Sequence, residues 1–272
     1  MSTVPQQQAT TPAKTSTGDF VWHELRTTDA KGAEEFYTHV VRWQAKSSGD
    51  PGGVPYKLLS VGDLGAAGLM QLTPQMLEGG VKPGWAGFIG VDDVDAYAKR
   101  VEQAGGKLQC PPQDIPTIGR FASVEDPQGA AFLLFKGSLE YAPPRPAAGT
   151  PGTVGWNELS ANDEQSAWPF YSDLFGWSVD STMDMGPNGI YRIFNNGGAR
   201  MGAMMTRDQK NSPVPFWLFY FNVDNIDEAA TRIKEKNGQL LMGPHQVPGD
   251  VWIILGLDPQ GVMFALVGPR KP

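Results

Sequence analysis

The feature that most constrains the fold of this chain is a phrase that occurs twice. One copy runs from Trp22 to Trp43 and the other from Trp156 to Trp177. Eight of the 22 aligned positions are identical at a constant spacing of 134, among them a Glu-Leu pair, an Asp and a Phe-Tyr pair. A period this long indicates two copies of a domain rather than a solenoid of short repeats.

The repeat continues beyond the opening phrase. The stretch 91–95 matches 223–227, and Asp-Pro-Gln-Gly occurs at both 126–129 and 258–261. The first residues of the chain are rich in Gln, Thr, Ser and Pro and contain no apolar stretch, as in a disordered tail. We therefore expect a disordered tail over 1–19, one domain over 20–138, a Pro/Gly/Ala-rich linker over 139–153 and a second domain over 154–268.

Composition limits the partners and the compartment. The chain has 272 residues, a hydrophobic content of 40%, a charged content of 19% and a net charge of −7. These values predict a soluble globular protein and argue against nucleic acid or an anionic membrane surface as a partner. The single Cys110 excludes an internal disulfide, which favours a reducing cytoplasm, and no motif around it suggests a nucleophile. A monomer or a homodimer is compatible with these features.

Periodicity predicts the same elements in both copies. Residues 20–27 alternate as a strand does, and Asp29 and Asp163 are placed to cap amphipathic helices. Gly176 would end the second of these helices, in which Pro169 suggests a late start or a bent first turn. Further strands are predicted near 56–61, 66–72, 85–91, 121–124 and 131–135, a further helix near 94–104, and their equivalents in the second copy.

A strand, an Asp-capped helix with Phe-Tyr, a following Trp and a closing Asp-Pro-Gln-Gly strand pair together resemble the vicinal oxygen chelate superfamily. That superfamily includes glyoxalase I, bleomycin-resistance proteins and extradiol dioxygenases, and the repeated Trp-x-Glu-Leu start is similar to its tandem-domain bacterial branch. The resemblance covers about residues 20–136 and 154–268. It implies an α+β fold in which each domain consists of two βαβββ modules that form a curved sheet with a cleft. Which modules pair stays open.

The resemblance also identifies where metal-dependent members keep their ligands. The three positions of each domain fall on residues without a metal-binding lone pair: Trp22, Ala86 and Leu133 in the first copy, and Trp156, Leu218 and Ala265 in the second. Of the three histidines, alternation places His23 with Leu25 on the side away from the cleft, as a hydrogen-bonded structural residue. His39 lies on the first helix and His245 in a predicted loop. We therefore expect no cofactor; a divalent metal is possible but unsupported.

Alternation directs the repeated glutamates, Glu24 and Glu158, into the two clefts. A glutamate in the middle of a strand between large apolar neighbours needs a hydrogen bond, an ion pair or a proton. Three roles stay open: a structural bond to a nearby amide or tyrosine, a ligand anchor or general base, and a ligand of an atypical metal site. If either residue is catalytic, it is as such a base.

Other residues at matching positions suit the walls of an apolar cleft. Aromatic rings offer flat surfaces and methionine adapts to irregular guests. The candidate ligand-binding residues are Trp22, Tyr56, Met70 and Trp85 in the first copy, and Trp156, Tyr191, Met204 and Trp217 in the second. The tyrosines could also supply a phenol to the glutamates.

The sequence therefore favours a metal-free protein that binds a small organic or aromatic molecule in clefts anchored by the paired glutamates. An enzyme of the lyase or dioxygenase type, using Glu24, Glu158 or an atypical metal site, is the alternative. A scaffold with vestigial clefts is a third reading. Whether the chain is an enzyme stays undecided at this point.

Overall fold

The structure, a computed structural model, describes residues 17–49, 53–138, 146–210 and 213–271. Most of the predicted tail and the first part of the predicted linker lie outside these residues. No helix in the described ranges is long and apolar enough to cross a membrane.

The first domain is an eight-stranded mixed sheet with three helices. Its strands follow the order β2-β3-β4-β1-β5-β8-β7-β6. Its elements are β1 (Phe20–Thr27), α1 (Ala30–Val40), β2 (Gln44–Ser47), β3 (Tyr56–Val61), β4 (Leu64–Gln71), α2 (Pro74–Glu78), β5 (Gly84–Gly90), α3 (Val94–Gln103), β6 (Lys107–Ile115), β7 (Gly119–Glu125) and β8 (Ala131–Gly137).

The second domain repeats this order as β10-β11-β12-β9-β13-β16-β15-β14. Its elements are β9 (Val154–Ala161), α4 (Glu164–Phe175), β10 (Ser178–Asp184), a 3-10 turn (Gly186–Asn188), β11 (Ile190–Asn196), β12 (Ala199–Thr206), β13 (Phe216–Asn222), α5 (Ile226–Glu235), β14 (Gln239–Val247), β15 (Val251–Leu257) and β16 (Met263–Gly268).

The sheet order answers the question of module pairing. In each domain the first strands of the two modules, β1 with β5 and β9 with β13, run antiparallel at the centre of one sheet. Each pair is flanked by the last strands of its modules, which run parallel to them: β4 and β8 in the first domain, β12 and β16 in the second. Modules therefore pair with their chain neighbours, as two tandem α+β domains.

Local sequence signals explain where the first helices begin and end. The carboxylate of Asp29 accepts a hydrogen bond from the Gly32 amide at 2.9 Å, and that of Asp163 accepts one from the Gln165 amide. Gly176 ends α4 in the left-handed conformation with φ 71°. A late start of this helix is wrong: α4 begins at Glu164 and carries Pro169 within it, so one helical N–H is missing there.

The sequence did not predict the strands at the sheet edges. β6 contains two prolines and two register irregularities against β7, and β14 is irregular in the same place. Proline is tolerated on edge strands because one side of the strand needs no ladder hydrogen bonds. His245 accordingly lies in β14 rather than in the predicted loop.

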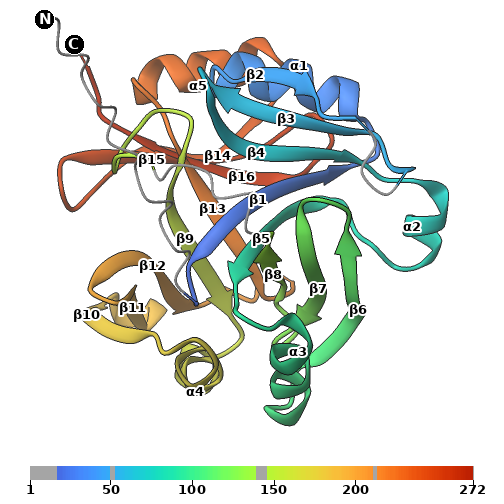
Figure 1. The fold of residues 1–272 in the computed structure, drawn as a ribbon. Coiled ribbons are helices and arrows are strands. Elements are labelled where there is room, and N and C mark those ends of the chain that lie inside the picture. Colours follow the sequence, from blue (N-terminus) through green and yellow to red (C-terminus); the bar gives the residue numbers. More distant parts are fainter. Residues whose placement is uncertain (1–16, 50–52, 139–145, 211–212, 272) are drawn as a thin grey trace, which may run out of the picture.

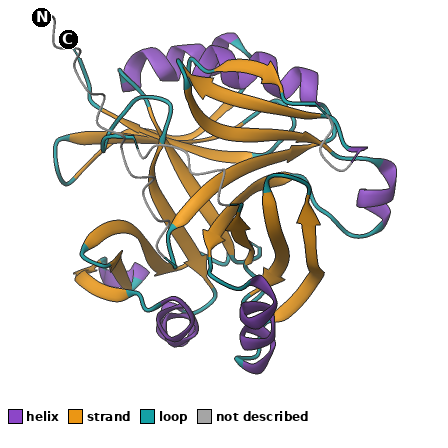
Figure 2. Cartoon of the chain, in the orientation of Figure 1, coloured by secondary structure: helices purple, strands orange, loops and turns teal. Residues whose placement is uncertain are grey.

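The two domains share one hydrophobic core, because the first helix of each packs on the other domain. On α1, the rings of Phe36 and Tyr37 contact Phe264 of β16. On α4, the rings of Phe170 and Tyr171 contact Phe132 of β8. Figure 1 shows the result: α1 lies beside α5 at one end of the molecule and α3 beside α4 at the other. The strands occupy the space between these two groups of helices (Figure 2).

A buried hydrogen-bond relay crosses the domain interface twice. The Tyr37 hydroxyl donates to Asp258 Oδ2 at 3.1 Å and accepts from Trp85 Nε1 at 3.0 Å. In the equivalent relay of the second copy, the Tyr171 hydroxyl donates to Asp126 Oδ2 at 3.0 Å and accepts from Trp217 Nε1 at 3.2 Å. Burial raises the pKa of both phenols, and the nearby carboxylates raise it further.

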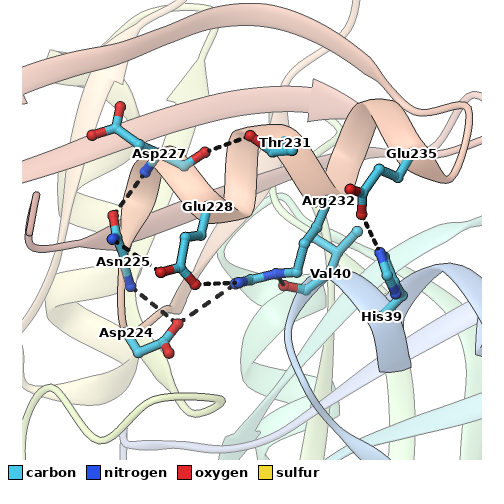
Figure 3. Close-up of polar contacts among 9 residues, drawn as sticks. All are labelled: His39, Val40, Asp224, Asn225, Asp227, Glu228, Thr231, Arg232 and Glu235. Carbon is cyan, nitrogen blue, oxygen red and sulfur yellow. Dashed lines mark hydrogen bonds and ion pairs between the residues drawn. The ribbon is translucent and has the colours of Figure 1, made fainter.

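Two arginines, Arg100 of α3 and Arg232 of α5, stabilise the same interface. Arg232 of α5 is buried, and its Nε donates to the Val40 carbonyl at the end of α1 at 3.0 Å (Figure 3). Beside it, His39 Nε2 and Glu235 Oε2 are 2.7 Å apart. At the other end of the molecule, Arg100 Nη2 donates to the Asp173 carbonyl at 2.9 Å. Each arginine thus satisfies a carbonyl in the last turn of the other domain's first helix.

Equivalent residues of the two copies meet between the central strands. His23 Nε2 lies 3.0 Å from Asn157 Oδ1, and the two positions are 134 residues apart. Because Asn157 Nδ2 donates to the Met201 carbonyl, its Oδ1 faces His23, so the imidazole Nε2–H is the donor. Burial lowers the pKa of His23 to about 4, partly opposed by this hydrogen bond. His23 is therefore a neutral, buried residue of the domain interface.

Removing one phenol from the relay should destabilise the protein. We expect Tyr37→Phe and Tyr171→Phe each to lower the free energy of unfolding by about 1–3 kcal/mol, because a buried carboxylate and a buried indole N–H each lose a partner. Urea unfolding measures this change. Tyr97→Phe is the control, since within the described residues the Tyr97 hydroxyl makes no hydrogen bond. Equal losses in all three variants would contradict the role of the relay.

The stability contributed by His23 should depend on pH. Unfolded histidine takes up its proton near pH 6.5 and the folded His23 only near pH 4. The unfolded state therefore binds more protons between these values, so stability present above pH 6.5 falls toward pH 4. In His23→Gln, which keeps a donor for Asn157, the loss between pH 7 and pH 4.5 should be smaller by about 2–3 kcal/mol.

Urea unfolding at the two pH values measures the difference. His245→Gln is the matched control because this side chain is exposed. The assignment of a neutral, buried His23 fails if both variants keep the pH dependence of the parent protein.

Candidate functional site

A cavity of about 1540 Å³ opens on the first domain and extends to the second, whose residues 214–217 and 260–263 also line it. Side chains of the central strands line it: Trp22, Glu24 and Arg26 from β1, Tyr56 from β3, Met70 from β4 and Phe88 from β5. Alternation along β1 places the first three on one face of the sheet. Apolar and aromatic walls with few polar groups are typical of sites for small organic molecules.

An indole–phenol pair is present on the concave face of both domains. Trp22 Nε1 donates to the Tyr56 hydroxyl at 3.0 Å, and Trp156 Nε1 donates to the Tyr191 hydroxyl at 2.9 Å. Each bond joins β1 to β3, or β9 to β11, across the strand between them. It fixes the indole ring against the sheet, so the tryptophan forms a rigid wall.

The two glutamates have different partners. Glu158 is buried and accepts hydrogen bonds from the hydroxyls of Tyr191, at 2.7 Å, and Tyr220, at 3.2 Å. Burial raises the pKa of Glu158, although both phenols oppose the rise. The phenols are themselves raised in pKa by burial and by the carboxylate. Both carboxylate oxygens of Glu158 are therefore bound by its own domain.

Glu24 has a charged partner instead. Its Oε1 accepts from Arg26 Nε at 3.1 Å, and both side chains line the cavity. The central strand of the second module bears Phe88 where the second domain has Tyr220, so the second phenol is missing. In β1, Arg26 stands where β9 has Ser160. Two substitutions between the copies thus convert a carboxylate enclosed by phenols into an ion pair that faces a cavity.

Donors for a metal do not converge at the positions that the family resemblance identified. Trp22, Ala86 and Leu133 lie on β1, β5 and β8, and the second domain has Trp156, Leu218 and Ala265 on the equivalent strands. Indole and alkyl groups cannot coordinate a divalent ion. In the described part of the chain, no group of three or more His, Cys, Asp or Glu residues could hold one. The residues present do not fit the metal of the metal-dependent members.

One pair of predicted cleft residues and one further residue need correction. The indoles of Trp85 and Trp217 belong to the interface relays, and their rings pack on Tyr37 and Tyr171. Atoms of both tryptophans border the large cavity, but the ring contacts and the indole hydrogen bonds place the side chains in the shared core. Alternation gives the reason: Ala86 and Leu218 face the clefts, so the residues before them face away.

Met204 is the second correction. It is fully buried, and it pairs with Leu159, which also faces the core. In the first domain Met70 pairs with Arg26, whereas in the second Met205 pairs with Ser160. Met205 is therefore the equivalent of Met70. The spacing between copies is 135 here, one more than in the opening phrase, and a one-residue slip reverses the face of a strand.

Sequence reasoning missed two residues of the concave faces. Tyr220 could have been found by alternation from Leu218. Cys110 could not, because Pro111 and Pro112 concealed the strand β6 that carries it to the cavity wall. Burial raises the pKa of the Cys110 thiol, while the charge of Arg26 and a hydrogen bond from Gln113 act in the opposite direction. Cys110 and Arg26 line the same cavity.

Relatives support the assignment that the fold suggests. CFP32 of Mycobacterium tuberculosis (strain CDC 1551 / Oshkosh), which bears the name "Putative glyoxylase", is 31% identical over 249 residues, 91% of this chain and 94% of that protein. The anthracycline biosynthesis protein DnrV of Streptomyces peucetius is 30% identical over 262 residues, 92% of this chain and 93% of that protein.

Solved structures share the fold at low sequence identity. The Mn(II)-bound glyoxalase from Novosphingobium aromaticivorans matches with a TM-score of 0.65 and 16% identity, over 94% of this chain and 83% of that one. The 2,2',3-trihydroxybiphenyl 1,2-dioxygenase from Sphingomonas wittichii strain RW1 matches with a TM-score of 0.64 and 15% identity, over 94% and 92%. At such identities the likeness shows the fold alone.

The model of one protein family matches both halves of the chain, over residues 19–134 and 153–266. The chain belongs to the glyoxalase/bleomycin resistance protein/dioxygenase superfamily, as a member with two tandem domains.

Proposed function

We propose that this protein binds a sizeable aromatic small molecule, without a metal, in the concave cleft of its first domain. The observation that carries the proposal is the cavity of about 1540 Å³ with Trp22, Met70 and Phe88 in its walls and the ion pair of Glu24 and Arg26 as its polar anchor. Binding would come mainly from burial of apolar ligand surface, and the polar groups would set its orientation.

The residues at the family's metal-ligand positions support binding without a metal. The three ligand positions of the first domain hold Trp22, Ala86 and Leu133, and the last two make the floor of the cleft apolar. A ligand would thus contact hydrocarbon where metal-dependent relatives place an ion.

The glutamates would have separate roles. Both oxygens of Glu158 are occupied by phenols of its own domain, which supports a structural role. Glu24 lines the cavity, and in the described part of the chain its one side-chain partner is Arg26, so this ion pair is the anchor. Of the two sequence-predicted anchors, the proposal therefore keeps the first.

The name of one relative bears on the identity of the ligand, and the name of another bears on the alternative function, that of an enzyme. A protein named for anthracycline biosynthesis is consistent with a large polycyclic aromatic guest. A relative named as a glyoxylase favours the second candidate, an enzyme of the lyase or oxygenase type in which Glu24 transfers a proton. Mass spectrometry of a bound ligand before and after incubation would show such turnover, and Glu24→Gln should abolish it.

Filling the cavity should prevent binding of a neutral aromatic probe. We expect N-phenyl-1-naphthylamine to gain fluorescence on binding the parent protein at one site. Ala86→Trp should weaken its binding at least about tenfold, because the new ring occupies the floor of the cleft. Val179→Trp adds the same ring at an exposed position of β10 and should leave binding unchanged.

Fluorescence titration gives both dissociation constants, and circular dichroism verifies folding. The proposal is wrong if the parent protein does not bind the probe, or if folded Ala86→Trp binds it as the parent does.

The glutamates should also differ in their effect on stability. Glu158→Gln turns an amide N–H₂ toward one of two phenol donors, so we expect a loss of about 1–3 kcal/mol in unfolding free energy. Glu24→Gln keeps an oxygen for Arg26 Nε and should cost less than about 1 kcal/mol. Urea unfolding of both variants tests this. Equal losses would mean that Glu24 is as structural as Glu158.

A further inference from the structure

Arg26 is a mostly enclosed cation with unused hydrogen-bond donors. Its side chain is 16% exposed, and within the described residues its only hydrogen bond is the one from Nε to Glu24. A guanidinium has five N–H donors, so the four on its terminal nitrogens have no protein acceptor there. The described side-chain atoms that are fully buried without a partner do not include these nitrogens, so they remain open to the cavity and can bind an acceptor that enters it.

The groups around Arg26 leave its charge available. On its own sheet it lies between Met70 of β4 and Gly84 of β5. Near it on the cavity wall is the Cys110 thiol, whose pKa burial raises, so this neighbour is neutral. Asp114, also on the wall, is bound by Arg120 at 2.9 Å. Glu24 is the carboxylate that Arg26 contacts, and it engages the Nε edge of the guanidinium.

The second domain supplies an internal comparison. There Ser160 replaces Arg26, and two phenols satisfy the glutamate. The cationic group is therefore a property of the first cleft and not of the fold. Because the Nε bond to Glu24 orients the guanidinium plane, the terminal nitrogens form a fixed fork, the geometry that binds planar oxyanions through two parallel bonds.

We propose that the first cleft recognises aromatic acids: ligands with an apolar ring system and an anionic oxygen group, such as a carboxylate or sulfonate, held by the terminal nitrogens of Arg26. Glu24 positions the guanidinium through Nε, and Trp22, Met70 and Phe88 contact the rings. This selectivity rests on the proposed binding function of the same cleft, since the rings must enter the cavity before the anion can reach Arg26.

Two probes with the same ring system separate the anion site from the apolar cleft. 8-Anilinonaphthalene-1-sulfonate carries an anionic group, and N-phenyl-1-naphthylamine is its neutral counterpart. We expect Arg26→Gln and Arg26→Ser to weaken binding of the sulfonate at least about tenfold and to change binding of the neutral probe less than about twofold. Glu24→Gln should strengthen sulfonate binding because it removes a competing negative charge.

The control for net charge is Arg200→Gln, which removes an exposed arginine that pairs with Asp180 at 2.8 Å on the second domain. It should leave both affinities unchanged. Arg26→Lys keeps the charge but not the fork, and should bind the sulfonate with intermediate affinity. Circular dichroism shows whether each variant is folded.

The outcomes distinguish the two proposals. If the neutral probe does not bind the parent protein, the binding function itself fails. If the neutral probe binds but the Arg26 variants keep sulfonate affinity, or lose both probes equally, the anion site is overturned while the cleft stands. An effect of Arg200→Gln as large as that of Arg26→Gln would also overturn it, since bulk charge would then explain the result.

Discussion

The hydrogen bond from a helix tyrosine to a buried aspartate of the other domain is the constraint on which the rest of the structure depends. Tyr37 reaches Asp258, and Tyr171 reaches Asp126. Each aspartate also accepts bonds from backbone amides of its own Asp-Pro-Gln-Gly turn. The phenol therefore ties the helix of one domain to the Asp-Pro-Gln-Gly turn of the other. Because both relays are buried, separating the domains would break these bonds and leave two phenol hydroxyls and two carboxylates without their partners.

This constraint decides which face of each sheet is free. The apolar faces of the first helices pack on the other domain, where the indoles of Trp85 and Trp217 complete the relays. The concave faces are left to contact a ligand. A residue of a central strand therefore serves either the interface or the cleft according to its parity along the strand. Trp22 and Glu24 line the cavity, whereas His23 between them hydrogen-bonds to Asn157 across the interface, although it also borders the cavity.

Much of the fold could be predicted from sequence because its signals are local. The caps at Asp29 and Asp163, the amphipathic helices and the central strands follow from spacing within a few residues. The edge strand β6 could not be predicted, because Pro111 and Pro112 argue against a strand unless its edge position is known. Gly243-Pro244 had the same effect in β14.

The candidate site was only partly predictable for a different reason. Parity along a single strand identified Glu24, Glu158 and both leading tryptophans. A constant spacing between the copies assigned Met204 to the cleft. At this strand the spacing is 135, so Met205 is the equivalent of Met70 and the Met204 side chain lies in the core. The partners of the glutamates also depended on tertiary pairing. Glu158 meets Tyr220 only because β9 and β13 are adjacent, and no spacing in the sequence shows this.

Duplication explains why the two copies agree where they do and differ where they do. Tyr37 and Tyr171, like Asp126 and Asp258, are identical pairs because each member bonds to the other copy, so a change in one would leave a buried partner unsatisfied. Within the described residues, Arg26, Phe88, Ser160 and Tyr220 make no side-chain hydrogen bond to the other domain. At these positions the first copy has Arg26 and Phe88 where the second copy has Ser160 and Tyr220. Two changes were enough to leave one carboxylate enclosed by phenols and the other paired with a cation at the wall of a cavity. The buried interface residues are thus constrained by their partners in the other domain. The difference in chemistry between the clefts comes from a few side chains that have no such partners among the described residues.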